Sequence, residues 1–223
     1  MRPALLALSI VTLAACSDSS DEPFDAAAYD GGSETEAVLE DDAVDPVSDL
    51  GDADPPGLER PQTTTGVISI EGEDEAIALR LVRYEDVSLP FSTYVPDGWT
   101  DEVSGSGEGT AVRFAMGAAP MQGVVSLFVP SDANQNDTVG LARAVAESRG
   151  GFGEFEDGEG PDWATAGFSF ADDSGAGSVT VGEHDGTSFY IIEEFPYDMG
   201  DGFVPRAEMI QDRLVWLDDG TGL

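Results

Sequence analysis

The chain contains one histidine, His184, which lies in a predicted turn between Glu183 and Asp185. An imidazole can act as a general base or ligate a metal ion. The chain has no second histidine, and its one cysteine is Cys16, so a zinc site lacks the ligands it needs. Nucleophilic catalysis would need a placed serine, and no Gly-x-Ser-x-Gly elbow precedes a helix. We expect a solvated turn histidine without a chemical role.

A second candidate site is the loop that carries Asp132, Asn134 and Asn136, whose spacing is that of the start of an EF-hand calcium loop. Such a loop needs glycine at its sixth position and glutamate at its twelfth, where this chain has Asp137 and Arg143. Because both residues that impose the geometry are missing, we predict a polar loop that leads into a helix, and no metal site.

Adjacent carboxylates form a third group of candidates. Paired acids held about 5–10 Å apart across a cleft can hydrolyse glycosides. In a chain with 45 acidic residues such pairs arise by chance, so a carboxylate-dependent hydrolase is the alternative and not the main prediction. The glycine-rich stretches 105–109 and 150–160 lack the lysine of a phosphate-binding loop, and we expect them to be surface loops without a cofactor. The most evident acidic pairs are Glu193–Glu194, Asp172–Asp173 and Asp218–Asp219.

The elements that must position these residues are mostly short strands. Alternating apolar and polar residues, bounded by Gly, Asp and Pro, are typical of strands and turns. Asp-Gly pairs between such runs predict hairpins, and the sequence has one in His184-Asp185-Gly186. Asp172-Asp173-Ser174-Gly175 predicts another turn, so consecutive strands should pair antiparallel. The predicted strands are 66–70, 76–84, 91–95, 110–116, 124–129, 165–170, 178–182 and 188–195.

Two helices interrupt this pattern. The first should be capped by Asp137 or Thr138 and end at Gly150. In the second, Pro205 fits the first turn, and Ala207, Ile210 and Leu214 form one apolar stripe. The order strands, helix, strands, helix predicts an α+β fold, an antiparallel β-sheet with helices packed on it.

The composition is strongly acidic. Against 45 acidic residues stand nine basic ones, all of them arginine, and the net charge is −36. Halophilic proteins use such charge to stay soluble, and salt screens its self-repulsion. Because the acids are spread along the whole chain, we expect adaptation to a salty medium. A cation-binding surface is an alternative, and nucleic acid is excluded as a partner because phosphate binding needs a basic surface.

The N-terminus resembles that of bacterial lipoproteins. Arg2 precedes the apolar run 5–15, which is too short to span a membrane, and Leu13-Ala14-Ala15-Cys16 resembles a lipobox. The resemblance implies a signal peptide over 1–15 and a lipid on Cys16. Residues 16–62 carry many acids and two aromatic residues, so we predict a disordered linker before a domain over 63–223. Position 17, directly after Cys16, is a serine and lacks the aspartate that resembles an inner-membrane retention signal, so the outer membrane is the expected location.

Two segments of the domain resemble the PsbP-like family, named for an extrinsic photosystem subunit. They are the turn Val95-Pro96-Asp97-Gly98-Trp99 and the late strand, loop and helix of 195–216. The resemblance implies an α-β-α sandwich, which is usually a non-enzymatic binding or assembly module, and it brings no catalytic residues. We expect Trp99 and Trp216 to pack in the core.

Together these observations predict a lipid-anchored cell-envelope protein, non-enzymatic and without a cofactor. Its partners would be the membrane, through the lipid on Cys16, and an unidentified envelope protein or small ligand.

Overall fold

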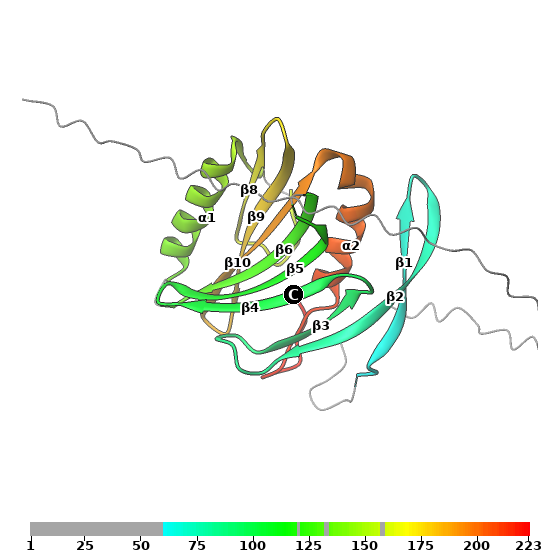
Figure 1. Ribbon diagram of the computed structural model, residues 1–223. Helices are drawn as coiled ribbons and strands as arrows, with labels where there is room; N and C mark the ends of the chain where they lie inside the picture. The colour runs from blue at the N-terminus through cyan, green and yellow to red at the C-terminus, as the bar shows by residue number, and fades with distance from the viewer. Residues whose placement is uncertain (1–59, 120, 132–133, 157–158) are drawn as a thin grey trace, which may run out of the picture. The chain divides into compact units, whose positions relative to one another are not determined.

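The computed structural model describes residues 60–119, 121–131, 134–156 and 159–223 (Figure 1). The predicted signal peptide, Cys16 and nearly all of the acidic linker lie outside these residues. The described residues form an α+β domain with two antiparallel sheets, which confirms the predicted fold class.

The large sheet has seven strands in the order β4-β5-β6-β10-β9-β8-β7, and every neighbouring pair is antiparallel. Two strands were not predicted, and they are the two edges of this sheet. All residues of β4 are exposed, so it lacks the alternation by which a half-buried strand is recognised. The bounds are β4 (Thr100–Ser106), β5 (Gly109–Ala118), β6 (Met121–Pro130), β7 (Gly151–Glu154), β8 (Ala166–Ala171), β9 (Gly175–His184) and β10 (Thr187–Pro196).

The hairpin between β9 and β10 has the predicted two-residue turn. Thr187 pairs with His184, and Asp185 and Gly186 have φ angles of 45° and 75°. Positive φ at both central residues gives a turn whose twist matches that of the flanking strands. The turn therefore sets the register that places Glu193 of β10 opposite Ser178 of β9.

The helix α1 (Gln135–Arg149) connects β6 to β7. Its N-cap is Asn134, whose side chain accepts hydrogen bonds from the amides of Asn136 and Asp137, so the predicted cap at Asp137 or Thr138 was wrong by a few residues. The helix ends at Gly150 as predicted, where φ is 143°.

The two faces of the large sheet are covered differently (Figure 1). Ala142 and Ala146 of α1 pack on one face against Phe168, Val179 and other residues. The opposite face packs against the second helix, α2 (Gly200–Asp212), and against the small sheet. The small sheet has the order β1-β2-β3-β11, with β1 (Thr63–Ile70), β2 (Glu73–Tyr84), β3 (Phe91–Pro96) and β11 (Val215–Trp216).

Residues 60–62, the last of the predicted linker, lie against the small sheet. The Arg60 guanidinium donates to the Ser92 hydroxyl over 2.9 Å and to the carbonyl of Arg213 over 3.0 Å. The hydroxyl of Tyr94 donates to the carbonyl of Pro61. The chain therefore enters the domain at the small sheet.

Helix α2 begins earlier than predicted. Pro205 lies inside the helix and not in its first turn, and a short 3-10 helix, η1 (Tyr197–Met199), leads into it. Phe203 is fully buried, stacks on Trp99 with centroids 5.6 Å apart and packs over Gly123, where no side chain fits. Burial of Phe203 draws the residues before Pro205 into the helix. Trp99 and Trp216 lie in the core, as predicted.

In the part of the chain described above, no helix is both long enough and apolar enough to cross a membrane.

Candidate functional site

A cavity of about 370 Å³ lies between α2, strands β9 and β10, and the segment that joins β7 to β8. We call it the acidic pocket, because three carboxylates line it and the lining residues include no arginine or histidine. Two aromatic rings and one side-chain amide also line the pocket. These residues are Phe155, Trp163, Glu193, Glu208, Gln211 and Asp212.

Glu193 is the central group of this pocket. It follows Phe189 and Ile191 on the same face of β10, so an acid occupies a position that the alternation reserves for core residues. Its carboxylate accepts hydrogen bonds from the Gln211 amide and, over 3.5 Å, from the Ser178 hydroxyl. It keeps some surface towards the cavity, but protein atoms surround it closely.

Burial raises the pKa of Glu193 to about 6, since desolvation penalises the charged form. The hydrogen bond from Gln211 opposes this shift, and the nearby charge of Glu208 adds to it. Burial also raises the pKa of Asp212, against the charge of Arg213. The pocket therefore holds carboxyl groups that take up protons more readily than exposed ones, and a bound cation would compensate their charge.

Glycines make room for the two aromatic rings. A side chain at Gly167 of β8 would overlap the ring of Phe155, and one at Gly182 of β9 would meet Trp163 and Phe189. Trp163 also packs against Phe189, with ring centroids 5.9 Å apart. These rings give the acidic pocket an apolar part of its wall.

His184 is not the solvated turn residue that the sequence predicts. Its side chain is nine-tenths buried, it stacks on Trp216 with centroids 4.6 Å apart, and its Nε2 lies 3.0 Å from Asp218. The prediction failed because Trp216 and Asp218 are far away in the sequence and come to His184 only through the C-terminal segment. Donor atoms of His184, Asp218 and Asp219 all lie within 4.8 Å of one another, so this group could hold a metal ion.

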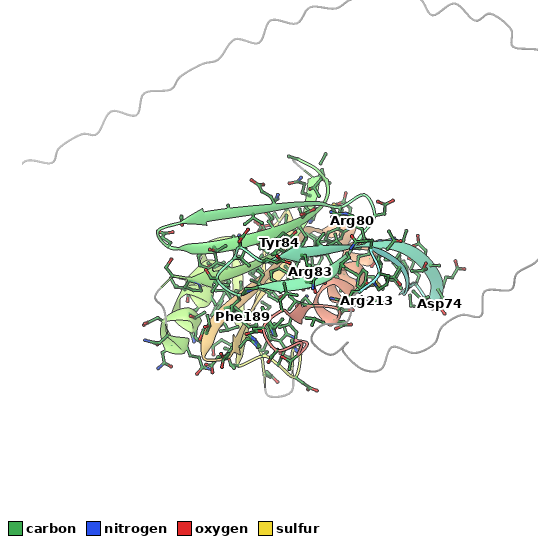
Figure 2. The ribbon with its side chains drawn as sticks, turned by 90° about the horizontal axis from the view of Figure 1, so that it is seen from below. Asp74, Arg80, Arg83, Tyr84, Phe189 and Arg213 are labelled. Carbon is green, nitrogen blue, oxygen red and sulfur yellow. The ribbon has the colours of Figure 1, made fainter. Side chains whose placement is uncertain are left out.

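A second polar group lies between the sheets. The Tyr84 hydroxyl donates to Asp101 over 2.7 Å, and Arg80 donates to the other oxygen of the same carboxylate over 2.6 Å. Burial alone would raise the pKa of Asp101, but the bonds from Tyr84 and Arg80 lower it. Burial raises the pKa of Tyr84. Figure 2 shows Arg80 and Tyr84 along β2, with Asp74 at the far end of that strand. Because the charges are paired, we assign this group to stability.

The other residues considered in the sequence have structural roles or lie outside the described residues. Asn134 caps α1, as a polar loop residue would. Asp172 closes the turn before β9 by accepting hydrogen bonds from the amides of Ser174 and Gly175. Cys16, the predicted lipidation site, and Asp132 lie outside the described residues.

In the sequence, Glu193 is one member of one acidic pair among several, and Glu208, Gln211 and Asp212 were not predicted as site residues. The available signal was the position of Glu193, two residues beyond Ile191 on an apolar face. The three residues of α2 flank its apolar stripe, and only the packing of the helix brings them to Glu193.

Comparisons with known proteins add little to this picture. No protein-family model and no curated protein matches the chain. Among solved structures it is similar to LpqN, described as involved in cell envelope biogenesis of Mycobacterium tuberculosis. The identity is 14%, the TM-score is 0.39, and the similarity covers 62% of this chain and 91% of that chain. This TM-score is too low to establish a shared fold, and no PsbP-like family is confirmed.

Proposed function

We propose that this protein is a lipid-anchored component of a bacterial cell envelope, and that its domain is a non-enzymatic binding module. The anchoring part rests on the lipobox-like segment that ends at Cys16. The PsbP-like resemblance supports a module that binds or assembles and does not catalyse. The acidic surface fits a protein that works in a salty medium, anchored in the outer membrane and facing either the periplasm or the cell surface.

The observation that carries the binding function is the acidic pocket. It holds Glu193, Glu208 and Asp212 without a basic residue among its lining, beside the rings of Phe155 and Trp163. Carboxylates and aromatic faces together attract organic cations, through charge and through the ring quadrupole. The ligand class that fits is a small organic ammonium ion.

The binding function is tested with choline and spermidine as probes, by titration calorimetry and by intrinsic tryptophan fluorescence, to which Trp163 in the pocket contributes. Binding should strengthen as pH rises from 5 to 7, because Glu193 ionises in this interval. Glu193→Gln should weaken binding at pH 7 and remove most of this pH dependence, whereas Glu194→Gln, on the other face of β10, should not. Equal binding by wild type and Glu193→Gln would contradict the proposal, and calcium binding alone would favour the cation-binding surface instead.

A second candidate function is favoured by one observation. Glu193, with a pKa raised to about 6, shares the cavity with Glu208, and a carboxylic acid beside a second carboxylate is the pair used in glycoside hydrolysis. A panel of glycosidase, esterase and peptidase substrates separates the two functions. We expect no turnover; a reproducible activity that disappears in Glu193→Gln would establish the hydrolase.

The anchor is tested separately. Cys16→Ala should leave the precursor uncleaved and remove acyl labelling, since the cysteine carries the lipid. A variant that still matures and partitions into detergent as wild type does would contradict lipidation.

A further inference from the structure

A second cavity lies on the opposite face of the large sheet, beyond the end of α1. Its volume is about 360 Å³, and we call it the arginine pocket. Glu193 and Glu194 are neighbours on β10, yet Glu193 lines the acidic pocket and Glu194 lines this one. The other side chains that matter here are Arg113, Met121, Arg149, Phe170 and Asp172.

Arg113 of β5 is unusual among the arginines of this acidic chain. Its cross-strand neighbour on β4 is Glu102, and directly opposed residues have their Cβ atoms about 5 Å apart. Arg113 nevertheless donates to the amide oxygen of Gln122 over 3.0 Å. Among the described residues it forms no ion pair with Glu102 or with any other carboxylate. A guanidinium has five N–H donors, so a half-buried Arg113 keeps unused donors at this cavity.

The acids of the arginine pocket have partners already. Glu194 accepts from the Arg149 guanidinium over 2.9 Å, and that guanidinium also lies over the ring of Phe170. Asp172 accepts from the Ser174 hydroxyl and amide, both over 2.7 Å, and these bonds lower its pKa. Arg113 is therefore the one guanidinium lining this cavity that forms no ion pair with a described carboxylate.

We propose that the arginine pocket binds the carboxylate of a small organic acid. A guanidinium without an ion pair matches one carboxylate, which it can hold through two parallel hydrogen bonds. Met121, which is about half exposed, offers an apolar surface for the rest of the ligand. This site is independent of the acidic pocket, because the two lie on opposite faces of the sheet and differ in the charge of their ligands.

The test uses the mature lipidated protein in detergent, with benzoate as the probe and neutral benzamide as its uncharged analogue. Titration calorimetry should detect benzoate and not benzamide. Arg113→Gln should weaken benzoate binding at least tenfold, and Arg113→Lys, which keeps the charge but loses the fork, about as much. The matched control is Arg143→Gln, which removes an arginine paired with Glu154 outside the pocket and should leave binding unchanged.

Other outcomes decide against the proposal. The proposal is overturned if benzoate does not bind. It is also overturned if Arg113→Lys and Arg113→Gln bind benzoate as tightly as wild type does, or if benzamide binds as tightly as benzoate. Inorganic phosphate that binds as tightly as benzoate would overturn the assignment to a carboxylate. Glu193→Gln should bind benzoate normally, so failure here and failure of the acidic pocket are distinguishable.

Discussion

Glu193 and Glu194 illustrate how neighbours in a chain acquire different chemistry. Alternation along β10 sends Glu194 to an exposed ion pair with Arg149 and Glu193 to a cavity wall without a cation. Burial raises the pKa of Glu193, which has no ion pair among the described residues, to about 6. The titration of Glu193 can therefore be used to follow the protonation of the acidic pocket.

This shift predicts a pH-dependent stability. The folded chain holds a proton on Glu193 up to a pKa of about 6, while the unfolded chain gives it up near 4.5. The stabilisation from this proton is therefore complete below pH 4.5 and is lost as pH rises through 6, and it amounts to about 2 kcal/mol. Glu193→Gln has no titratable carboxyl group at this position. Between pH 4.5 and 7, the free energy of unfolding of wild type should therefore fall by about 2 kcal/mol relative to that of the variant.

Urea unfolding at several pH values measures this difference. Glu194→Gln is the matched control, and its stability should follow that of wild type through the same interval. Parallel curves for wild type and Glu193→Gln would show that Glu193 titrates normally.

His184 provides a second prediction at this scale. Its bond to Asp218 and its stack on Trp216 fasten the C-terminal segment to β9. His184→Phe keeps a ring for the stack and loses the bond, and should cost about 1–2 kcal/mol in the free energy of unfolding. His184→Ala loses both and should cost more. Guanidinium unfolding gives both values, and a Phe variant as stable as wild type would mean that the bond to Asp218 contributes nothing.

At the scale of elements, the edges of the large sheet differ from its centre. The edge strand β4 carries Asp101, Glu102 and Gly105 and has no buried residue, which blunts its tendency to pair with another chain. The segment of β4 is a strand only because it pairs with β5. Central strands such as β9 carry buried valines and are recognisable from their sequence.

Strand glycines shape the acidic pocket. Gly167→Ala would place a methyl group within the ring of Phe155, which must then move out of the cavity wall. We expect a loss of about 1–3 kcal/mol in stability, together with weaker binding of choline. Gly105→Ala is the control, because open space surrounds Gly105 in β4. If both variants unfold at the same denaturant concentration, Phe155 does not depend on Gly167.

At the scale of the whole molecule, charge dominates. The domain carries about 30 of the 45 acidic residues, and ion pairs such as Arg80–Asp101 and Arg143–Glu154 compensate few of them. Self-repulsion destabilises a compact state with such a charge, and the Debye length falls from about 30 Å at 0.01 M salt to about 3 Å at 1 M.

The melting temperature should therefore rise steeply with sodium chloride below 1 M and more slowly above it. Calorimetry from 0.05 to 2 M salt measures this rise, with calcium chloride at matched ionic strength as the control for specific cation binding. A melting temperature that does not change with salt would remove the halophilic explanation.

Local sequence determined most of the regular structure of this domain. The Asp185-Gly186 turn needs residues that tolerate positive φ, and the apolar alternation of 188–195 needs a half-buried strand, so both follow from short-range chemistry. The apolar stripe of Ala207 and Ile210 predicted a helix for the same reason. These features depend on residues that are close together in the chain.

Tertiary structure alone decided the chemistry. The burial of His184 by Trp216, the early start of α2 around Phe203 and the cavity around Glu193 each depend on residues far apart in the sequence. The pKa of a side chain, its ring stacking and its ion pairing depend on all the groups packed around it. The residue pattern of one segment holds no information about neighbours that are distant in the sequence. The sequence thus specified the strands that carry Glu193 and Arg113, and the packing of those strands made two pockets, one lined by three carboxylates and the other by two arginines and two carboxylates.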